Sequence, residues 1–187
     1  MSQRFVVNDT PLAGLRVLQR QPLGDSRGFL ERMYCSDELA PLAPGCAIVQ
    51  INHTHTAARG TVRGMHYQLP PHAETKFVSC LRGEVFDVAV DLRAGSPTFL
   101  QWHAEILSVA NHKTLVIPEG FAHGFQTLSE DCEMLYFHTM AYEPTAECGL
   151  SATDPRLAIG WPLPVGGQSP RDLSHPLVET SFAGVVL

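Results

Sequence analysis

From residue 47 onward, short apolar or alternating runs are separated by clusters of turn-forming residues. The runs recur at the spacing of about 8–12 residues that is typical of a β-sandwich or β-barrel. The predicted strands are 47–53, 61–68, 76–81, 84–92, 101–108, 114–118 and 132–141. This pattern predicts a mostly β protein with a jelly-roll β-barrel.

Residues 84–92 show the alternation most clearly. Side chains of a β-strand point alternately to its two faces, so the apolar residues separate from the acidic ones. The two sets are Phe86, Val88, Val90 and Leu92 on one face, and Asp87 and Asp91 on the other. We expect the first face to pack in the core and the second to be solvated or functional.

The length of 187 residues predicts a single domain spanning 1–187. Extended strands are expected at the N-terminus, and the tail after Trp161, which has little periodicity, should cross the barrel surface. Residues 1–20 contain no continuous apolar stretch, and no run approaches the about 20 residues of a membrane helix. A cytoplasmic protein without a membrane partner is therefore expected.

The charge and the cysteines exclude other classes. A formal net charge of −6 disfavours nucleic acid as a partner, because such proteins need a basic face. The five cysteines are widely spaced and never form a Cys-x-x-Cys pair: Cys35, Cys46, Cys80, Cys132 and Cys148. This favours reduced thiols over a disulfide framework or a structural zinc site.

Two segments resemble the motifs of the cupin superfamily. Residues 60–68 with Glu74 follow the first motif, and residues 118–123 follow the second. Metal-binding cupins supply a His-x-His pair, a carboxylate and a later histidine, but Gln68 replaces the second histidine here. Because an amide is a poor substitute for imidazole, a His66–Glu74–His123 metal site would be weak. We therefore expect no metal and no other cofactor.

A closer resemblance covers residues 25–172. Its motifs, in order, are Asp25-Ser-Arg-Gly28, Gln50-Ile-Asn52, Gly60-Thr-Val-Arg-Gly-Met-His-Tyr-Gln68, Lys76, Asp87, Val90-Asp-Leu-Arg93, Ser96-Pro-Thr-Phe99, Ile117-Pro-Glu-Gly-Phe-Ala-His-Gly-Phe125, Tyr136, Tyr142-Glu-Pro144, Glu147, Asp154-Pro155, Ile159-Gly-Trp-Pro162 and Ser169-Pro-Arg-Asp172. Together they are similar to the dTDP-4-dehydrorhamnose 3,5-epimerase family.

The resemblance implies four catalytic residues. His66 would remove the proton α to a sugar ketone, and Asp172 would fix the tautomer of His66 and raise its basicity. Lys76 would stabilise the enolate, which needs a cation or donor in a water-poor site. Tyr136, which is protonated at neutral pH, would return a proton to the opposite face of the sugar. Alternation places Tyr136 on the same strand face as His138.

The resemblance also implies a substrate-binding set and a homodimer. Arginines would clamp the diphosphate of a nucleotide-sugar partner, and Arg27 would reach across the dimer. The set is Arg27, Phe29, Glu31, Gln50, Asn52, Arg63, Asp87, His123, Tyr142, Glu147 and Arg171.

Two positions leave alternatives open. The family reads Arg-Gly-x-Phe-x-Glu near its N-terminus, whereas an ungapped match places Leu30 and Arg32 at the aromatic and acidic positions. Either Phe29 and Glu31 keep those roles after a deletion, or the nucleobase is recognised differently. Arg63 and His66 would project to opposite faces of a regular strand, so a bulge must redirect one of them or Arg63 serves another surface.

The expected reaction is epimerisation at C3, C5 or both of a nucleoside diphosphate 4-keto-6-deoxyhexose, of the dTDP-4-dehydro-6-deoxyglucose to dTDP-4-dehydrorhamnose type. The alternatives are a single-position epimerase or 3,4-ketoisomerase on a related nucleotide sugar, a metal-dependent cupin enzyme, and a non-catalytic carbohydrate-binding cupin.

Overall fold

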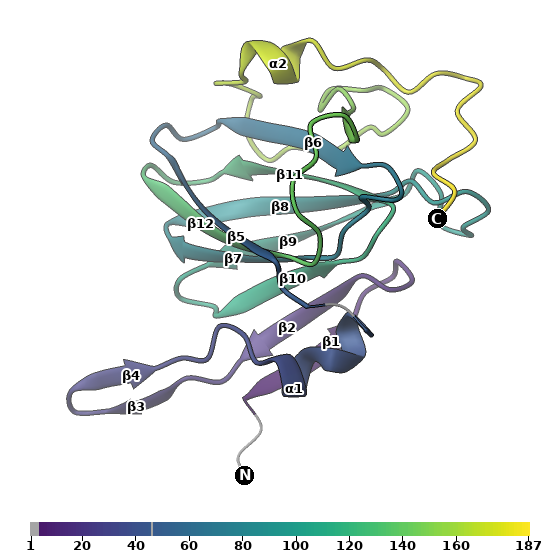
Figure 1. Ribbon diagram of the computed structural model, residues 1–187. Coiled ribbons are helices and arrows are strands. Elements are labelled where there is room, and N and C mark those ends of the chain that lie inside the picture. Colours follow the sequence, from purple (N-terminus) through teal and green to yellow (C-terminus); the bar gives the residue numbers. More distant parts are fainter. Residues whose placement is uncertain (1–3, 46) are drawn as a thin grey trace.

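The computed structural model describes residues 4–45 and 47–187, which form two facing antiparallel sheets (Figure 1). The strands are β1 Phe5–Asp9, β2 Arg16–Arg20, β3 Leu23–Asp25, β4 Gly28–Leu30, β5 Gln50–Thr56, β6 Val62–Gln68, β7 Lys76–Arg82, β8 Glu84–Asp91, β9 Trp102–Ser108, β10 Lys113–Ile117, β11 Phe121–Thr127, β12 Cys132–His138 and β13 Glu147–Gly149. The helices are α1 Ser36–Leu39, a 3-10 turn at Ala40–Leu42 and α2 Pro170–Leu173. The mostly β, jelly-roll prediction is confirmed.

The two sheets interleave segments that are distant in sequence. The six-stranded sheet has the order β1-β2-β10-β7-β12-β5, and the five-stranded sheet has the order β13-β6-β11-β8-β9. The first sheet therefore contains the expected N-terminal strands, β1 and β2. Predicted site residues lie on strands of both sheets: on β5, β7 and β12 of the six-stranded sheet and on β6 and β11 of the five-stranded sheet.

The core lies between the sheets. The inward-facing side chains of both sheets form one buried cluster, since every second residue of a strand points to the same face. Its members include Val17, Val78, Cys80, Val85, Ala89, Leu107, Leu115, Ile117, Phe121, Phe125 and Met134. Tyr136 belongs to the same cluster, which places it on the inner face of β12.

The outer face of the five-stranded sheet is also buried. Val88, Val90 and Leu92 pack there against the tail residues Val178 and Val185. Asp87 and Asp91, on the other face of β8, are both 0% exposed, so the solvated alternative for that face is wrong. Because β8 is a central strand with both faces covered, alternation in its sequence does not mark a wet face.

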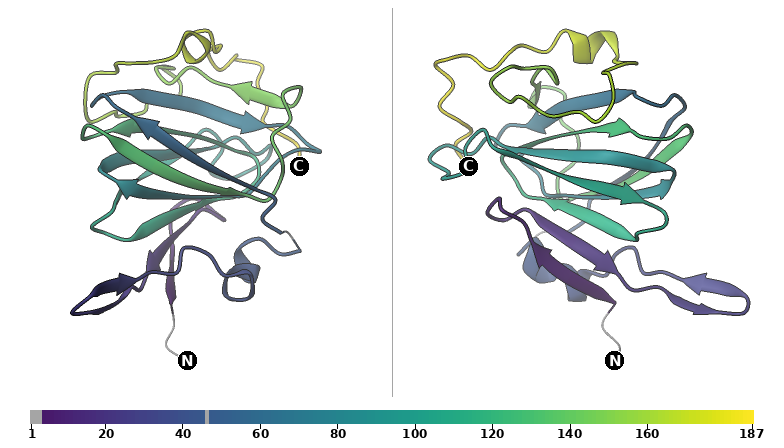
Figure 2. Two further views of the ribbon diagram at one scale, coloured as in Figure 1. Left: turned by 60° about the vertical axis from the view of Figure 1, so that its left-hand side comes forward. Right: turned by 180° about the vertical axis from the view of Figure 1, so that it is seen from behind.

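The tail after Trp161 crosses the surface of the five-stranded sheet, as predicted, and places α2 over β6 (Figures 1 and 2). Ser169 starts α2, because its hydroxyl accepts a hydrogen bond from the backbone N–H of Asp172 at 3.0 Å. The cap fixes where the Asp172 carboxylate lies.

The hairpin β3–β4 projects away from the two sheets (Figure 2). Every residue of both strands is exposed. This two-stranded element carries Phe29, with Arg27 in its turn. A free-standing hairpin of this kind is marginal in water without a partner surface.

Several predicted strand bounds need correction, and the short strand β13 was not predicted. The strand β11 was not predicted, because Phe121–Thr127 is buried on both faces and does not alternate. Residues 47–49 are not in a strand, and the last predicted strand ends at His138 rather than at residue 141.

Two further sequence predictions concern cysteines and membranes. Cys35, Cys80, Cys132 and Cys148 are free thiols, and Cys46 lies outside the described residues. Among the helices of the described chain, none has the length and apolarity to cross a membrane.

Candidate active site

A cavity of about 380 Å³ lies among β5, β6, β7, β11, β12, β13 and α2. Eleven of the fifteen predicted site residues line it: Gln50, Asn52, Arg63, His66, Lys76, His123, Tyr136, Tyr142, Glu147, Arg171 and Asp172. Residues separated by more than a hundred positions thus share one cavity wall. The side chains Thr54, Glu74, His138 and Ser169, which were not in the predicted site, line it as well.

A β-bulge in β6 turns both Arg63 and His66 into the cavity. His123 pairs with His66 and Phe125 pairs with Arg63, so three steps along β6 face two steps along β11. This outcome supports the bulge and excludes a separate surface for Arg63. A Cβ at Gly64 would lie 2.6 Å from the Cα of Gly124, so the two strands approach this closely only with glycine there.

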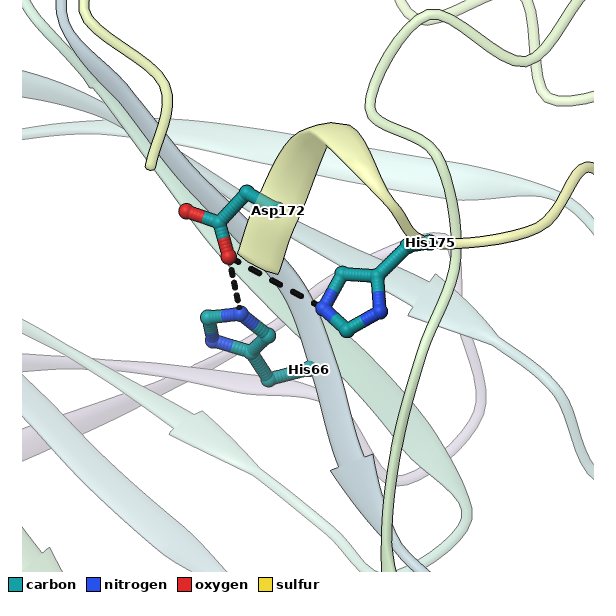
Figure 3. A group of neighbouring side chains, drawn as sticks. All are labelled: His66, Asp172 and His175. Atoms are coloured by element: carbon teal, nitrogen blue, oxygen red, sulfur yellow. Dashed lines mark hydrogen bonds and ion pairs between the residues drawn. The ribbon is translucent and has the colours of Figure 1, made fainter. Parts of the chain in front are cut away.

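His66 and Asp172 form a short hydrogen bond, with His66 Nε2 2.7 Å from Asp172 Oδ1 (Figure 3). The Asp172 side chain is 6% exposed and the His66 side chain 31%. Burial lowers the pKa of His66, more than the hydrogen bond and charge of Asp172 raise it. The neutral imidazole is therefore available as a base over a wider pH range than in water.

Tyr136 lies between two histidines of the cavity. Its ring is stacked on His138 and edge-to-face with His123, with ring centroids 6.1 Å apart in each pair. Burial raises the pKa of Tyr136 well above its ordinary value. The phenol remains a proton donor throughout the neutral pH range.

Lys76 is held by a network that the sequence did not predict. Lys76 Nζ lies 3.0 Å from Glu74 Oε1, and Glu74 Oε2 lies 2.7 Å from His138 Nδ1. Burial alone would raise the pKa of Glu74, but His138 and Lys76 outweigh it and lower the pKa. The only sequence signal was the alternation that placed His138 on the Tyr136 face.

His123 is backed by a buried carboxylate. Its Nε2 lies 2.8 Å from Oδ1 of Asp87, and both side chains are buried. The second oxygen, Oδ2 of Asp87, is buried without a hydrogen-bond partner. Two members of the predicted substrate-binding set are therefore paired, although Asp87 lies behind His123 rather than in the cavity wall.

Two arginines mark the cavity rim. Arg63 Nε donates to the hydroxyl of Thr56 at 2.9 Å, and Arg171 forms an ion pair with Glu147. Glu147 also accepts a 2.6 Å hydrogen bond from the hydroxyl of Tyr142. The rim can thus present guanidinium groups to a phosphate.

Besides Asp87, three predicted residues lie outside this cavity. Arg27 pairs with Asp25 in the projecting hairpin and its side chain is 87% exposed. Phe29 is 62% exposed. Glu31 binds Arg20 and His112, at 2.8 Å in each case. The fold of one chain does not bring these residues to His66.

The cupin metal set is not assembled. Glu74 pairs with Lys76 and His138, and His123 pairs with Asp87. Over the residues that the structure describes, the group with metal-ligand spacing is His66, Asp172 and His175 instead (Figure 3).

A jelly roll whose cavity holds histidine–carboxylate pairs, a tyrosine and a lysine defines a proton-transfer enzyme on a cupin-type scaffold. Residues 9–180 match the family described as dTDP-4-dehydrorhamnose 3,5-epimerase. The chain belongs to this family, whose enzymes are isomerases.

Curated relatives of the chain are described as dTDP-4-dehydrorhamnose 3,5-epimerases. The protein of Salmonella typhimurium is 40% identical over 180 residues, covering 95% of this chain and 98% of the relative. The protein of Pseudomonas aeruginosa is 49% identical over 142 residues, covering 75% and 77%. A crystal structure from Legionella pneumophila, in complex with dTDP-4-keto-L-rhamnose, has a TM-score of 0.87 and 40% identity, with 92% of each chain covered.

Proposed function

We propose that this protein epimerises C3 and C5 of dTDP-4-dehydro-6-deoxyglucose, giving the dTDP-4-dehydrorhamnose type of product without a metal or redox cofactor. The observation that carries this proposal is the meeting of His66, Asp172, Lys76 and Tyr136 around one cavity. Binding alone requires no such set of proton donors and acceptors.

The first step is removal of the proton α to the C4 ketone. In the required tautomer, Nε2–H of His66 donates to Asp172 and the lone pair of Nδ1 accepts the carbon-bound proton. The electron pair of the C–H bond moves onto the ketone oxygen to give an enolate. The ammonium of Lys76, whose side chain is 11% exposed, stabilises this oxygen.

The second step delivers a proton to the opposite face of the same carbon. The Tyr136 hydroxyl is the donor, since burial keeps it protonated. The enolate collapses to the ketone with inverted configuration. Repetition at the second α-carbon gives the double epimer.

The diphosphate of the nucleotide requires positive charge for binding, and a chain with a net charge of −6 can supply it only locally. Arg63 and Arg171 of the cavity rim bind the diphosphate in this proposal, together with the remaining polar wall residues Gln50, Asn52 and Tyr142. Arg27, Phe29 and Glu31 act from the hairpin side of a second subunit. The working form is then a cytoplasmic homodimer, with one domain per chain.

Deuterium uptake tests the reaction. In heavy water the enzyme should exchange the sugar protons α to the ketone, and His66→Ala should lower this rate by about 10²–10⁴-fold. His55→Ala is a matched control, because His55 forms an exposed pair with Asp131 outside the cavity. Full exchange by His66→Ala would exclude His66 as the base.

Counting deuterons separates the related enzymes. Two incorporated deuterons indicate a 3,5-epimerase, whereas one indicates a single-position epimerase or a 3,4-ketoisomerase. Loss of activity on chelation, with stoichiometric metal in the purified protein, would instead indicate a metal-dependent cupin enzyme.

A further inference from the structure

His175 is a third member of the His66–Asp172 group and has no role in the proposed proton transfers. It follows α2, and its Nε2 lies 3.8 Å from Oδ1 of Asp172 (Figure 3). Its ring is edge-to-face with that of His66, with centroids 5.4 Å apart.

The position of His175 depends on a glycine in the neighbouring strand. Gly149 of β13 pairs with His66 of β6, and a Cβ at Gly149 would lie 2.3 Å from the His175 ring. The absence of that Cβ leaves the space that the imidazole fills. The chain thus brings a second imidazole against Asp172 through both α2 and β13.

The Nε2 atom of His175 is buried and has no hydrogen-bond partner. A buried polar atom without a partner destabilises the folded state, so it needs an explanation. A ligand that binds this nitrogen would remove this destabilisation. Among the described residues, the group that it faces at ion-pair distance is the Asp172 carboxylate, which is already bonded to His66.

We propose that His66, Asp172 and His175 bind a divalent transition-metal ion such as Zn²⁺, and that the bound ion inhibits the enzyme. The inhibition rests on the proposed role of His66 as the base, whereas the binding does not. The site is distinct from the cupin metal set, since Glu74 and His123 take no part in it.

The geometry suits a zinc ion after small movements. Zinc binds histidine nitrogen and carboxylate oxygen at about 2.0–2.2 Å, so tetrahedral ligand atoms lie about 3.3 Å apart. The three ligand atoms here all lie within 4.8 Å of one another, with separations of 2.7 and 3.8 Å from Asp172. Two histidines and one carboxylate leave a coordination position for water.

The charges near the site favour a cation. Asp172 supplies one negative charge, and neutral imidazoles supply the other two donors. The positive charge of Arg171, the residue before Asp172, is paired with the Glu147 carboxylate. Lys76 is likewise paired with Glu74.

Inhibition follows from the tautomer of His66. Metal binding uses the lone pair of Nε2, so the proton of the neutral ring must sit on Nδ1. Nδ1 then has no lone pair to accept a proton from the sugar. Because the positioned base contributes about 10²–10⁴-fold, saturating Zn²⁺ should lower the exchange rate by about the same factor.

Two measurements test the site. Co²⁺ added to the metal-free enzyme should give a visible d–d absorption band that saturates at one ion per chain. Zn²⁺ should displace the Co²⁺ ion and lower the rate of deuterium exchange. A chelator should reverse this inhibition. Each variant is compared with its own metal-free rate, so that a change in basal activity does not enter the result.

The variants separate this site from other histidines. His175→Gln removes one ligand and should lower the affinity for Co²⁺ and Zn²⁺ by about 10–100-fold or more. Gly149→Ala keeps His175, but the added Cβ would clash with its ring and displace it, so metal binding should weaken too. His55→Ala, at the exposed His55–Asp131 pair, should bind both ions as the wild type does.

The outcomes distinguish this proposal from the proposed function. Absence of the Co²⁺ band, or equal binding by wild type and His175→Gln, would overturn the metal site, while loss of exchange in His66→Ala would still support His66 as the base. A band that depends on His175, without any inhibition, would overturn both the inhibitory role and the assignment of the base.

Discussion

Nε2 of His66 lies 2.7 Å from Oδ1 of Asp172, although 106 residues separate them in the chain. The partners come from β6 and from α2, which the serine cap of α2 fixes over that strand. Replacement of the carboxylate by an amide removes the charge behind the imidazole without removing its bulk.

Asp172→Asn should lower kcat and shift the acidic limb of the pH profile. Burial already lowers the pKa of His66, and Asp172 is the main opposing influence. The base works deprotonated, so activity falls as pH drops through this pKa, below the ordinary value of about 6.5. The variant should move this limb to still lower pH. A limb that moves upward would contradict the electrostatic role of Asp172.

Tyr136→Phe should separate proton removal from proton return. The base remains, so exchange of the abstracted proton with solvent continues, whereas formation of the epimer falls by about 10²–10⁴-fold. Proton NMR in heavy water measures both on the same sample. Tyr34→Phe is the matched control, because Tyr34 packs on Phe77 and Phe137 and does not line the cavity. Equal loss of exchange and epimerisation would exclude Tyr136 as a separate acid.

Glu74→Gln should weaken the stabilisation of the enolate by Lys76, because it removes the negative charge that Lys76 pairs with. Glu74 is the buried counter-ion of Lys76, and breaking a buried pair costs about 3–5 kcal/mol. Without this counter-ion the Lys76 ammonium is no longer held in place, which weakens its interaction with the enolate and lowers kcat. Acetylation at neutral pH should then modify Lys76 faster. Lys113, the chain's other lysine, is the internal reference. An unchanged ratio of the two rates would contradict this coupling.

Arg27→Ala should raise KM without affecting stability. Arg27 is exposed in the hairpin, and a lost charge-assisted contact of about 1.5–3 kcal/mol corresponds to about a 10–100-fold rise. Leu23→Ala, at an exposed position of the same hairpin, is the control. Mixing Arg27→Ala with His66→Ala should restore activity through mixed dimers if the hairpin serves the partner's site. Without restoration, Arg27 acts in its own chain or not at all.

Asp91→Asn should destabilise the fold in a pH-dependent way. Burial would raise the pKa of Asp91, but hydrogen bonds from Arg93, Ser96 and Thr98 lower it to about 2 from 3.8. A depressed pKa stabilises the folded state above the ordinary value, and this contribution is lost as pH falls towards 2. Urea unfolding should show a loss of about 3–5 kcal/mol at pH 7 that shrinks below pH 4. A constant difference would contradict this.

Several features could be predicted because they depend on local sequence. The alternation of apolar residues and the spacing of turns predict most strands of the two sheets, and the ordered motifs identify His66, Lys76 and Tyr136. The strand β11 could not be predicted in this way, since its central position buries both faces and removes the alternation. The same reason made the Asp87 face of β8 appear open to solvent.

The sequence by itself determined the β class, the family resemblance and the types of acid and base available, because residue type and period are properties of the chain. Only the tertiary structure decided that Glu74 holds Lys76 and His138, that a bulge turns Arg63 and His66 into one cavity, and that His175 lies against Asp172. These relationships join β6, β7, β12 and the tail, whose distances depend on strand register and on the packing of α2. No local pattern encodes such distances.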